Sequence, residues 1–184
     1  MNTHPAIHTV GHGNRSGAEF LALLGDARIE ALVDVRAYPG SRRHPQFARE
    51  ALERSLAEAG VRYLWEGTAL GGRRRPAQDS PHVALRNEGF RAYADHMMSQ
   101  AFRQGLDRVL AIAGGGRTAI MCAERLPWQC HRWLIADYLV THAVRVLHII
   151  APGEPREHVP ARELRVVEGR LVYDYGNVTV LPLP

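Results

Sequence analysis

The stretch RTAIMCAERLPWQCHRWLIADYLVTHAVRVLHII, residues 117–150, decides the fold. Its two ends, Arg117–Cys122 and Val144–Ile150, are short and largely apolar runs of the length that buried strands have. Between them, Pro127–His142 has the periodicity of a helix, with a proline in the first turn, where proline is favoured. A strand, a helix and a second strand in succession predict a βαβ unit with parallel strands.

The same alternation runs through most of the chain. Ser16 precedes a helical pattern, and Glu19 completes the sequence of a capping box. We therefore predict a single-domain α/β fold with a mostly parallel sheet and helices on both faces. Residues 1–152 form the α/β domain with the site, and residues 153–184 form a hairpin and tail packed on the same domain. The other expected elements are strands Ile7–Val10, Ile29–Val35 and Val61–Trp65, helices Phe47–Ala59 and Glu88–Ala113, and hairpin strands Glu163–Val167 and Arg170–Tyr175.

Composition is that of an ordinary globular protein of 184 residues, long enough for one domain with a substantial core. No apolar run reaches the ~18 residues that cross a bilayer, so no membrane partner is expected. Met1–Ile7 shows no signal-peptide pattern, and we predict a cytoplasmic protein with reduced thiols. All 23 basic residues are arginine. A GC-rich genome is the simpler explanation, although guanidinium groups also bind phosphate and carboxylate in bidentate fashion.

Polar segments with chemically useful side chains follow three of the predicted strands. They are residues 11–14, 36–43 and 122–125. In open parallel sheets, ligands bind beyond the carboxyl ends of the strands. The residues that we expect to line one concavity at this edge are His12, Arg36, Arg42, Glu124 and His131.

The loop that begins at Asp34 has the composition of an oxyanion site, with arginines and a serine after a Pro-Gly turn. Arg36, Ser41 and Arg42 are candidate anion-binding residues, and Arg132 is a fourth. Their guanidinium forks suit phosphate or another oxyanion. The alternative is a solvated loop in which Asp34 pairs with Arg36.

Both cysteines of the chain lie in the segment Cys122–Arg132. A thiol between a strand end and a helix N-terminus is placed where the helix dipole and nearby cations stabilise a thiolate. The loop is longer than the cysteine-plus-five-plus-arginine loop of phosphatases and rhodaneses, so a covalent mechanism of that type is not expected. Cys122 is a possible nucleophile, and the candidate general acids and bases are Glu124, His131 and His12.

Structural explanations compete with these assignments. Free cysteine often packs as a small apolar residue, and His12 between two glycines is compatible with an ordinary turn. Zinc is not expected, because Cys122, Cys130 and His131 leave a tetrahedral site short of one ligand. We predict no metal, no cofactor and no disulfide, with Cys122 buried. Arg73–Arg75 is expected to be a solvated run, with the steering of a polyanion as the alternative. It lies inside the irregular connection of residues 66–88, which is either a functional flap or partly disordered.

Several short motifs occur together in an order that resembles a known family. The family is the bacterial and archaeal domain of unknown function 488, and the resemblance spans roughly residues 7 to 150. It implies a compact α/β domain and no particular reaction. The motifs are Thr9-Val-Gly-His12, Asp34-Val-Arg36 followed by Pro39 and Ser41-Arg42, Leu70-Gly-Gly72, Cys122-Ala-Glu124 and Cys130-His131-Arg132.

Two functions from different classes follow from the sequence. The first is an enzyme that acts on a phosphorylated or otherwise anionic substrate, including a nucleotide or nucleic acid. The second is a non-catalytic module that binds nucleic acid through its arginines, with steep salt dependence. A grouping of cysteine, glutamate and histidine favours the enzyme, because binding to a phosphate backbone does not require these residues.

Overall fold

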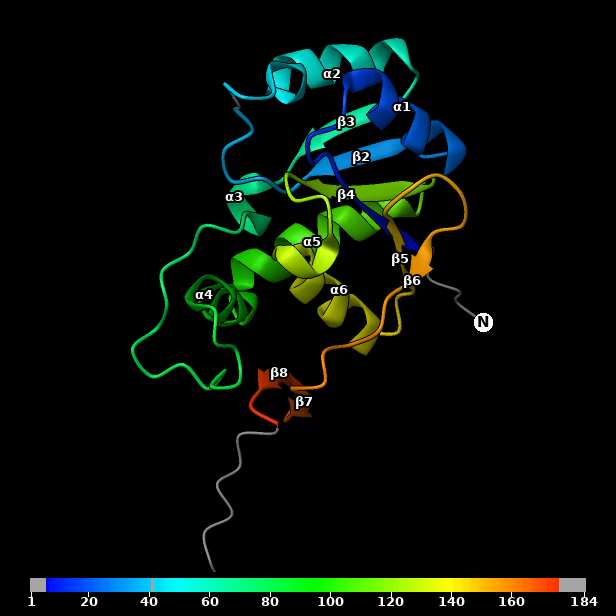
Figure 1. Ribbon diagram of the computed structural model, residues 1–184. Coiled ribbons are helices and arrows are strands. Elements are labelled where there is room, and N and C mark those ends of the chain that lie inside the picture. The colour runs from blue at the N-terminus through cyan, green and yellow to red at the C-terminus, as the bar shows by residue number, and fades with distance from the viewer. Residues whose placement is uncertain (1–5, 41, 176–184) are drawn as a thin grey trace, which may run out of the picture.

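The computed structural model describes residues 6–40 and 42–175 (Figure 1). Its centre is a six-stranded sheet in the order β3-β2-β4-β1-β5-β6. β1 to β5 are parallel, and the short β6 runs antiparallel to β5, so the predicted α/β class and mostly parallel sheet are confirmed. The strands are β1 (Ile7–Gly11), β2 (Ala31–Asp34), β3 (Arg62–Trp65), β4 (Thr118–Cys122), β5 (Val146–Ile149) and β6 (Arg156–Glu157).

Helices cover both faces of the sheet (Figure 1). One apolar core joins α1 and α2 to one face, and a second joins the other helices to the opposite face. Alternating side chains of β4 enter both cores: Ile120 lies in the second and Met121 in the first. The helices are α1 (Gly17–Asp26), α2 (Arg49–Glu58), α3 (Gly67–Leu70), α4 (Glu88–Met97), α5 (Gln100–Ala113) and α6 (Arg132–Thr141).

The connections that follow β4 and its two neighbouring strands go to opposite faces of the sheet. β1 and β2, the two neighbours of β4, lead into α1 and α2 on one face, whereas β4 leads into α6 on the other (Figure 1). The connections at its carboxyl end therefore diverge and leave a crevice there, the usual ligand site of an open parallel sheet. Cys122 is the last residue of this strand.

Serine side chains determine where two helices begin. Ser16 accepts a hydrogen bond from the backbone of Glu19, whose carboxylate in turn accepts one from the Ser16 backbone, so the expected capping box is present. The single long helix predicted over Glu88–Ala113 is wrong. It is divided into α4 and α5, because the Ser99 hydroxyl accepts from the Phe102 amide and starts a new helix.

The predicted helix over Pro127–His142 also begins later than expected. A short 3₁₀ turn, Pro127–Gln129, is followed by Cys130 in an extended conformation, and His131 is the N-cap of α6. The Cys130 side chain is buried and its sulfur accepts a hydrogen bond from Arg132. Burial of the Cys130 side chain in the apolar core outweighs the local helical tendency. Similarly, a 3₁₀ turn at Pro45–Phe47 precedes α2, which begins at Arg49.

The last described part of the chain forms the expected hairpin, β7 (Leu164–Val167) and β8 (Arg170–Tyr173). It is attached to the α/β part by a buried carboxylate. The Tyr173 hydroxyl donates to Asp137 of α6 at 2.9 Å, and His158 contacts the other oxygen of that carboxylate at 2.9 Å. Leu171 and Tyr173 belong to the same apolar core as α6.

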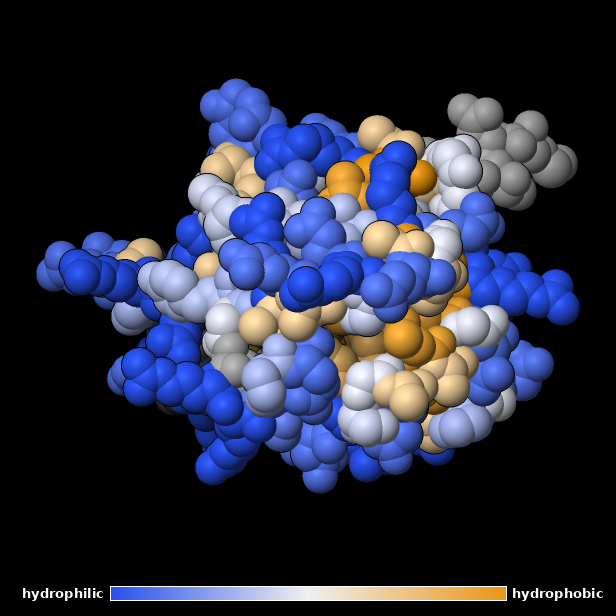
Figure 2. All heavy atoms as spheres, turned by 90° about the horizontal axis from the view of Figure 1, so that it is seen from above, coloured by the Kyte–Doolittle hydropathy of each residue, from blue (hydrophilic) through white to orange (hydrophobic). Residues whose placement is uncertain are grey.

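The face of the molecule on the α1 and α2 side, seen from above in Figure 2, is mainly hydrophilic, with apolar side chains gathered to one side. None of the described helices is both long and apolar enough to cross a membrane. The cytoplasmic location and the division of the chain into domains stay predictions.

We expect Tyr173→Phe to lower the free energy of unfolding by about 1–3 kcal/mol, because the buried Asp137 loses a hydrogen-bond donor. Tyr38→Phe is the control: Tyr38 is 72% exposed, and a change within about 0.5 kcal/mol is expected there. Urea unfolding followed by circular dichroism measures both. A single unfolding transition agrees with the prediction that the hairpin and the α/β part form one domain. A separate, earlier transition of the hairpin contradicts that prediction.

Candidate active site

A pocket of about 330 Å³ lies at the carboxyl end of β4. It is formed where the loops after β2 and β4 meet the segment after α3 and the start of α4. The side chains with reactive or charged groups in its lining are Arg36, Arg73, Cys122, Glu124, Cys130 and His131.

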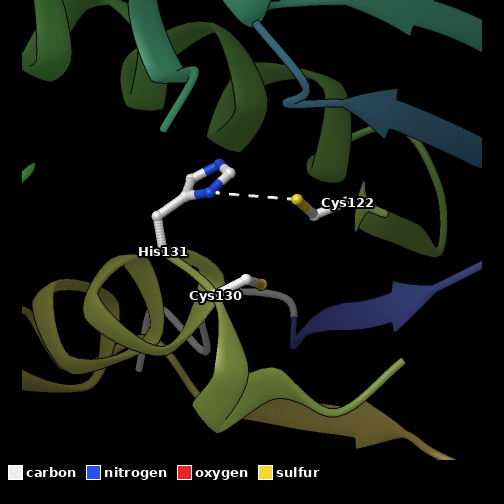
Figure 3. A group of neighbouring side chains, drawn as sticks. All are labelled: Cys122, Cys130 and His131. Atoms are coloured by element: carbon white, nitrogen blue, oxygen red, sulfur yellow. Dashed lines mark hydrogen bonds between the residues drawn. The ribbon is translucent and has the colours of Figure 1, made fainter. Parts of the chain in front are cut away.

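Cys122, Cys130 and His131 form the floor of this pocket (Figure 3). The Cys122 sulfur lies 3.8 Å from His131 Nδ1, and both sulfurs and this nitrogen lie within 4.8 Å of one another. Both cysteines are free and buried, as predicted for Cys122. The positions follow from the chain: Cys122 ends a strand, and the extended backbone at Cys130 directs its side chain back toward it.

The orientation of His131 is determined by the loop after β2. Its Nε2 lies 3.1 Å from the Val35 carbonyl oxygen, which only accepts hydrogen bonds, so Nε2 carries the proton. Nδ1 is consequently unprotonated, and its lone pair faces the Cys122 sulfur. Burial lowers the pKa of His131, which keeps the ring neutral.

Arg132 is a buried cation directly behind the two thiols, with 1% of its surface exposed. Its Nε donates to the Cys130 sulfur at 3.1 Å, Nη2 donates to the Glu124 carbonyl, and Nη1 contacts the Thr9 hydroxyl at 3.5 Å. No carboxylate of the described residues forms a salt bridge with it. A buried charge without a partner is costly, so a negative charge on the adjacent sulfurs is favoured.

The two thiols therefore differ in acidity. A hydrogen bond with Cys130 lowers the pKa of Cys122 to about 7, against the opposing effect of burial, and Arg132 lowers it further. Burial raises the pKa of Cys130 well above its usual range. At neutral pH, Cys122 is thus partly thiolate and Cys130 is a thiol that donates to it.

Two glycines allow the close approach of these segments. A Cβ on Gly11 would collide with the carbonyl oxygen of Glu124, so the end of β1 accommodates the loop that follows β4 only because this side chain is absent. A Cβ on Gly72 would lie 2.5 Å from His131 Nδ1. The segment after α3 therefore passes directly over the histidine nitrogen.

Two predicted site residues, Arg36 in the pocket lining and His12 outside it, are held in one buried network. Arg36 pairs with Asp34, Nη2 to Oδ2 at 2.6 Å, and its Nη1 donates to the Phe47 carbonyl at 2.9 Å. The competing expectation of an internal Asp34–Arg36 pair is therefore met, although the pair is buried and not solvated. His12 Nδ1 donates to a backbone carbonyl, its Nε2 faces Arg36, and burial lowers its pKa to about 4. His12 stacks on Phe47 and is not among the pocket-lining residues.

The other predicted residues lie at or beyond the rim of the pocket. The Glu124 side chain is exposed and lines the pocket, and Arg42 is exposed and lies outside the lining. Arg132 lies behind the lining. Ser41 lies outside the described residues.

Arg73 was missed by sequence reasoning. It is exposed, lines the pocket, and lies over the ring of Tyr38 at 5.5 Å. The expected solvated run is wrong for Arg74, which is half-buried and donates to the carbonyls of Gly71 and Thr68. The signal available in the sequence was the Gly-Gly pair directly before these arginines, which permits close approach of the backbone.

A larger hollow of about 1250 Å³ lies at the opposite, amino ends of the strands. Its lining includes glycines of the loop before β4 and the arginines Arg117 and Arg145, and no thiol. It is wide, and ligands of parallel sheets bind at the other edge. The smaller thiol pocket is therefore the candidate site.

Cys122, Cys130 and His131 are also the one group among the described residues whose donor atoms are close enough to hold a metal ion. Thiolate and imidazole are ligands of Zn²⁺ and similar cations. The same three residues thus have the geometry for thiol chemistry and for metal binding.

A family model described as "Domain of unknown function DUF488" matches residues 16–139, more than half of the chain. The chain belongs to this family. The matched range includes Arg36, Gly72, Cys122, Cys130 and His131, whereas β1 and His12 precede it. No curated protein and no solved structure matches the chain. Membership in the DUF488 family assigns no activity, so the function is argued from the site.

We expect alkylation of Cys122 by iodoacetamide to increase with pH and to reach half its maximal rate near pH 7 in chelator-treated protein, because the thiolate is the nucleophile. Cys130 reacts only at much higher pH. Mass spectrometry of the labelled peptides distinguishes the two, with Cys122→Ser as the control. A Cys122 midpoint at the ordinary thiol value of about 8.5 contradicts the expectation.

Proposed function

We propose that this DUF488 protein is a thiol-dependent enzyme that acts on a small anionic substrate, with Cys122 as the nucleophile. The observation that carries the proposal is the buried Arg132 guanidinium, which contacts the Cys130 sulfur and has no carboxylate partner in the described part of the chain. Arg132 also lowers the pKa of Cys122, so the thiolate of Cys122 compensates this cation. A purely structural cysteine pair has no need of it.

The roles of the neighbouring residues follow from their contacts. His131 Nδ1, whose lone pair faces the Cys122 sulfur, takes the proton of that thiol and passes it to solvent, so the ring returns to the neutral form that burial favours. The thiolate then attacks an electrophilic centre of the substrate, and the electron pair of the broken bond leaves with the departing group. Glu124, exposed in the pocket lining, is the residue placed to supply a proton to that group.

Arg73 is the residue best placed to bind the anionic part of the substrate. It is exposed in the pocket lining, whereas the guanidinium of Arg36 is already committed to Asp34 and a backbone carbonyl. Arg36 is therefore a positioning residue. Arg42 and Arg132, outside the lining, do not contact a substrate bound in this pocket.

Binding of nucleic acid without catalysis is the other function considered. It predicts an affinity that falls steeply with salt, because each phosphate contact releases counterions. It assigns no role to a paired thiol and histidine. The buried contacts of Cys122 therefore favour the enzyme.

We expect Arg132→Gln to raise the pH midpoint of Cys122 alkylation by about 1 or more, because the buried positive charge near the sulfur is lost. Arg125→Gln removes an exposed charge from the same loop and is the matched control, with little change expected. Circular dichroism confirms that each variant is folded. An unchanged midpoint in a folded Arg132→Gln variant removes the main support for a thiolate.

We also expect Cys122 to prefer an anionic reagent. For Cys122, the alkylation rate with iodoacetate divided by the rate with iodoacetamide should be severalfold higher than the same ratio for the thiol of glutathione. Inorganic phosphate should slow the alkylation of Cys122 by iodoacetate. Arg73→Gln should abolish the preference, whereas Arg75→Gln, outside the lining, should leave it unchanged. Equal ratios for Cys122 and glutathione would falsify the proposal of an anionic substrate. A steeply salt-dependent affinity for DNA or RNA, without a preference of Cys122 for the anionic reagent, favours the nucleic-acid-binding module.

A further inference from the structure

Three soft metal ligands converge at the floor of the pocket (Figure 3). In a tetrahedral zinc site with Zn–S near 2.3 Å and Zn–N near 2.0–2.1 Å, a sulfur and a nitrogen lie about 3.5 Å apart. The Cys122 sulfur and His131 Nδ1 are 3.8 Å apart, and the Cys130 sulfur lies within 4.8 Å of both. The Cys122–His131 pair needs a shift of a few tenths of an ångström, and the Cys130 sulfur needs one of at most about 1 Å.

The histidine is already oriented as a ligand. Metal-binding histidines usually donate their second ring nitrogen to a carbonyl or carboxylate, which fixes the tautomer. His131 Nε2 donates to the Val35 carbonyl at 3.1 Å, and Nδ1 is left with its lone pair toward the thiols. This arrangement needs no rotation of the ring.

The charge balance also suits a divalent cation. Each cysteine binds as a thiolate, so a thiol releases its proton on binding, and two thiolates neutralise a 2+ ion. Arg132 Nε donates to the Cys130 sulfur at 3.1 Å, a contact of the kind that supports ligating groups from behind. The two thiolates balance the charge of the ion alone, so the positive charge of Arg132 remains beside the site.

The pocket provides the remaining coordination position. Catalytic zinc sites have three protein ligands and an open position for water or substrate, whereas structural sites are closed by four. All three donor residues line the pocket, and Gly72 lies so close to the histidine ring that an added Cβ would be 2.5 Å from Nδ1. The lack of a fourth ligand, which argued against zinc in the sequence, is therefore no objection at an open site.

We propose that Cys122, Cys130 and His131 form a binding site for a thiophilic divalent cation such as Zn²⁺, with its fourth position open to the pocket. The bound ion coordinates the Cys122 sulfur and makes it unavailable for attack. The proposed metal site depends only on the geometry of these three residues. The loss of Cys122 reactivity when the ion is bound rests on the proposed function.

Cadmium is the probe, added to the reduced full-length protein. Wild-type protein should bind one Cd²⁺ with sulfur-to-cadmium charge-transfer absorption in the ultraviolet, and the bound ion should slow alkylation of Cys122 at least about tenfold. Cys130→Ser and His131→Gln should each weaken binding by about tenfold or more. His142→Gln, an exposed histidine at the end of α6, is the control and should bind as wild type does.

A second pair of variants tests the close approach of Gly72 to His131 Nδ1. Gly72→Ala should weaken Cd²⁺ binding while retaining both thiols, because the added Cβ meets His131 Nδ1. Gly25→Ala, where an added Cβ meets nothing within 4 Å, should have no effect. Both are compared by the same titration, with circular dichroism as the check on folding.

Absence of charge-transfer absorption in wild-type protein at stoichiometric Cd²⁺ overturns the metal site, and so does full affinity in both Cys130→Ser and His131→Gln. The wild-type titration decides even where a variant fails to fold. Cadmium binding without an anion preference at Cys122 leaves the metal site and removes the proposed function. An anion preference without cadmium binding removes the metal site and leaves the proposed function.

Discussion

The guanidinium of Arg132 is the interaction on which the candidate site depends. It joins the Thr9 hydroxyl of β1 to the Glu124 carbonyl and the Cys130 sulfur, which both belong to the loop between β4 and α6. The loop between β4 and α6 is thereby held against the neighbouring strand. Each buried group left without its hydrogen-bond partner costs about 1–3 kcal/mol, so loss of this side chain affects both stability and the acidity of the thiols.

The sheet topology explains why this chemistry lies at the end of β4. Loops from β2 and β4 diverge to opposite faces, and the Val35 carbonyl of one loop selects the tautomer of His131 at the end of the other. Thiol activation and metal binding then follow from the same arrangement. Both need an unprotonated nitrogen beside two sulfurs, with access from the pocket.

Much of the fold was predictable because its signals are local. Apolar runs separated by helical patterns indicated the parallel sheet, and Ser16 with Glu19 indicated the start of α1. Two predictions failed for different reasons. The break at Ser99 is a local N-cap inside a longer helical pattern, and that pattern concealed it. The extended backbone at Cys130 depends on burial of its side chain in the core, which is not visible in a linear sequence.

The sequence by itself determined the fold class, the family and the three segments that reach the carboxyl edge of the sheet, because hydrophobic period and motif order are properties of the chain alone. Only the tertiary structure decided the use of each side chain. Arg36 is paired inside the protein, Arg73 faces the pocket, and His12 is held beneath Arg36. Arginines of similar appearance in the sequence differ in burial and partners, and those depend on which segments the fold brings together.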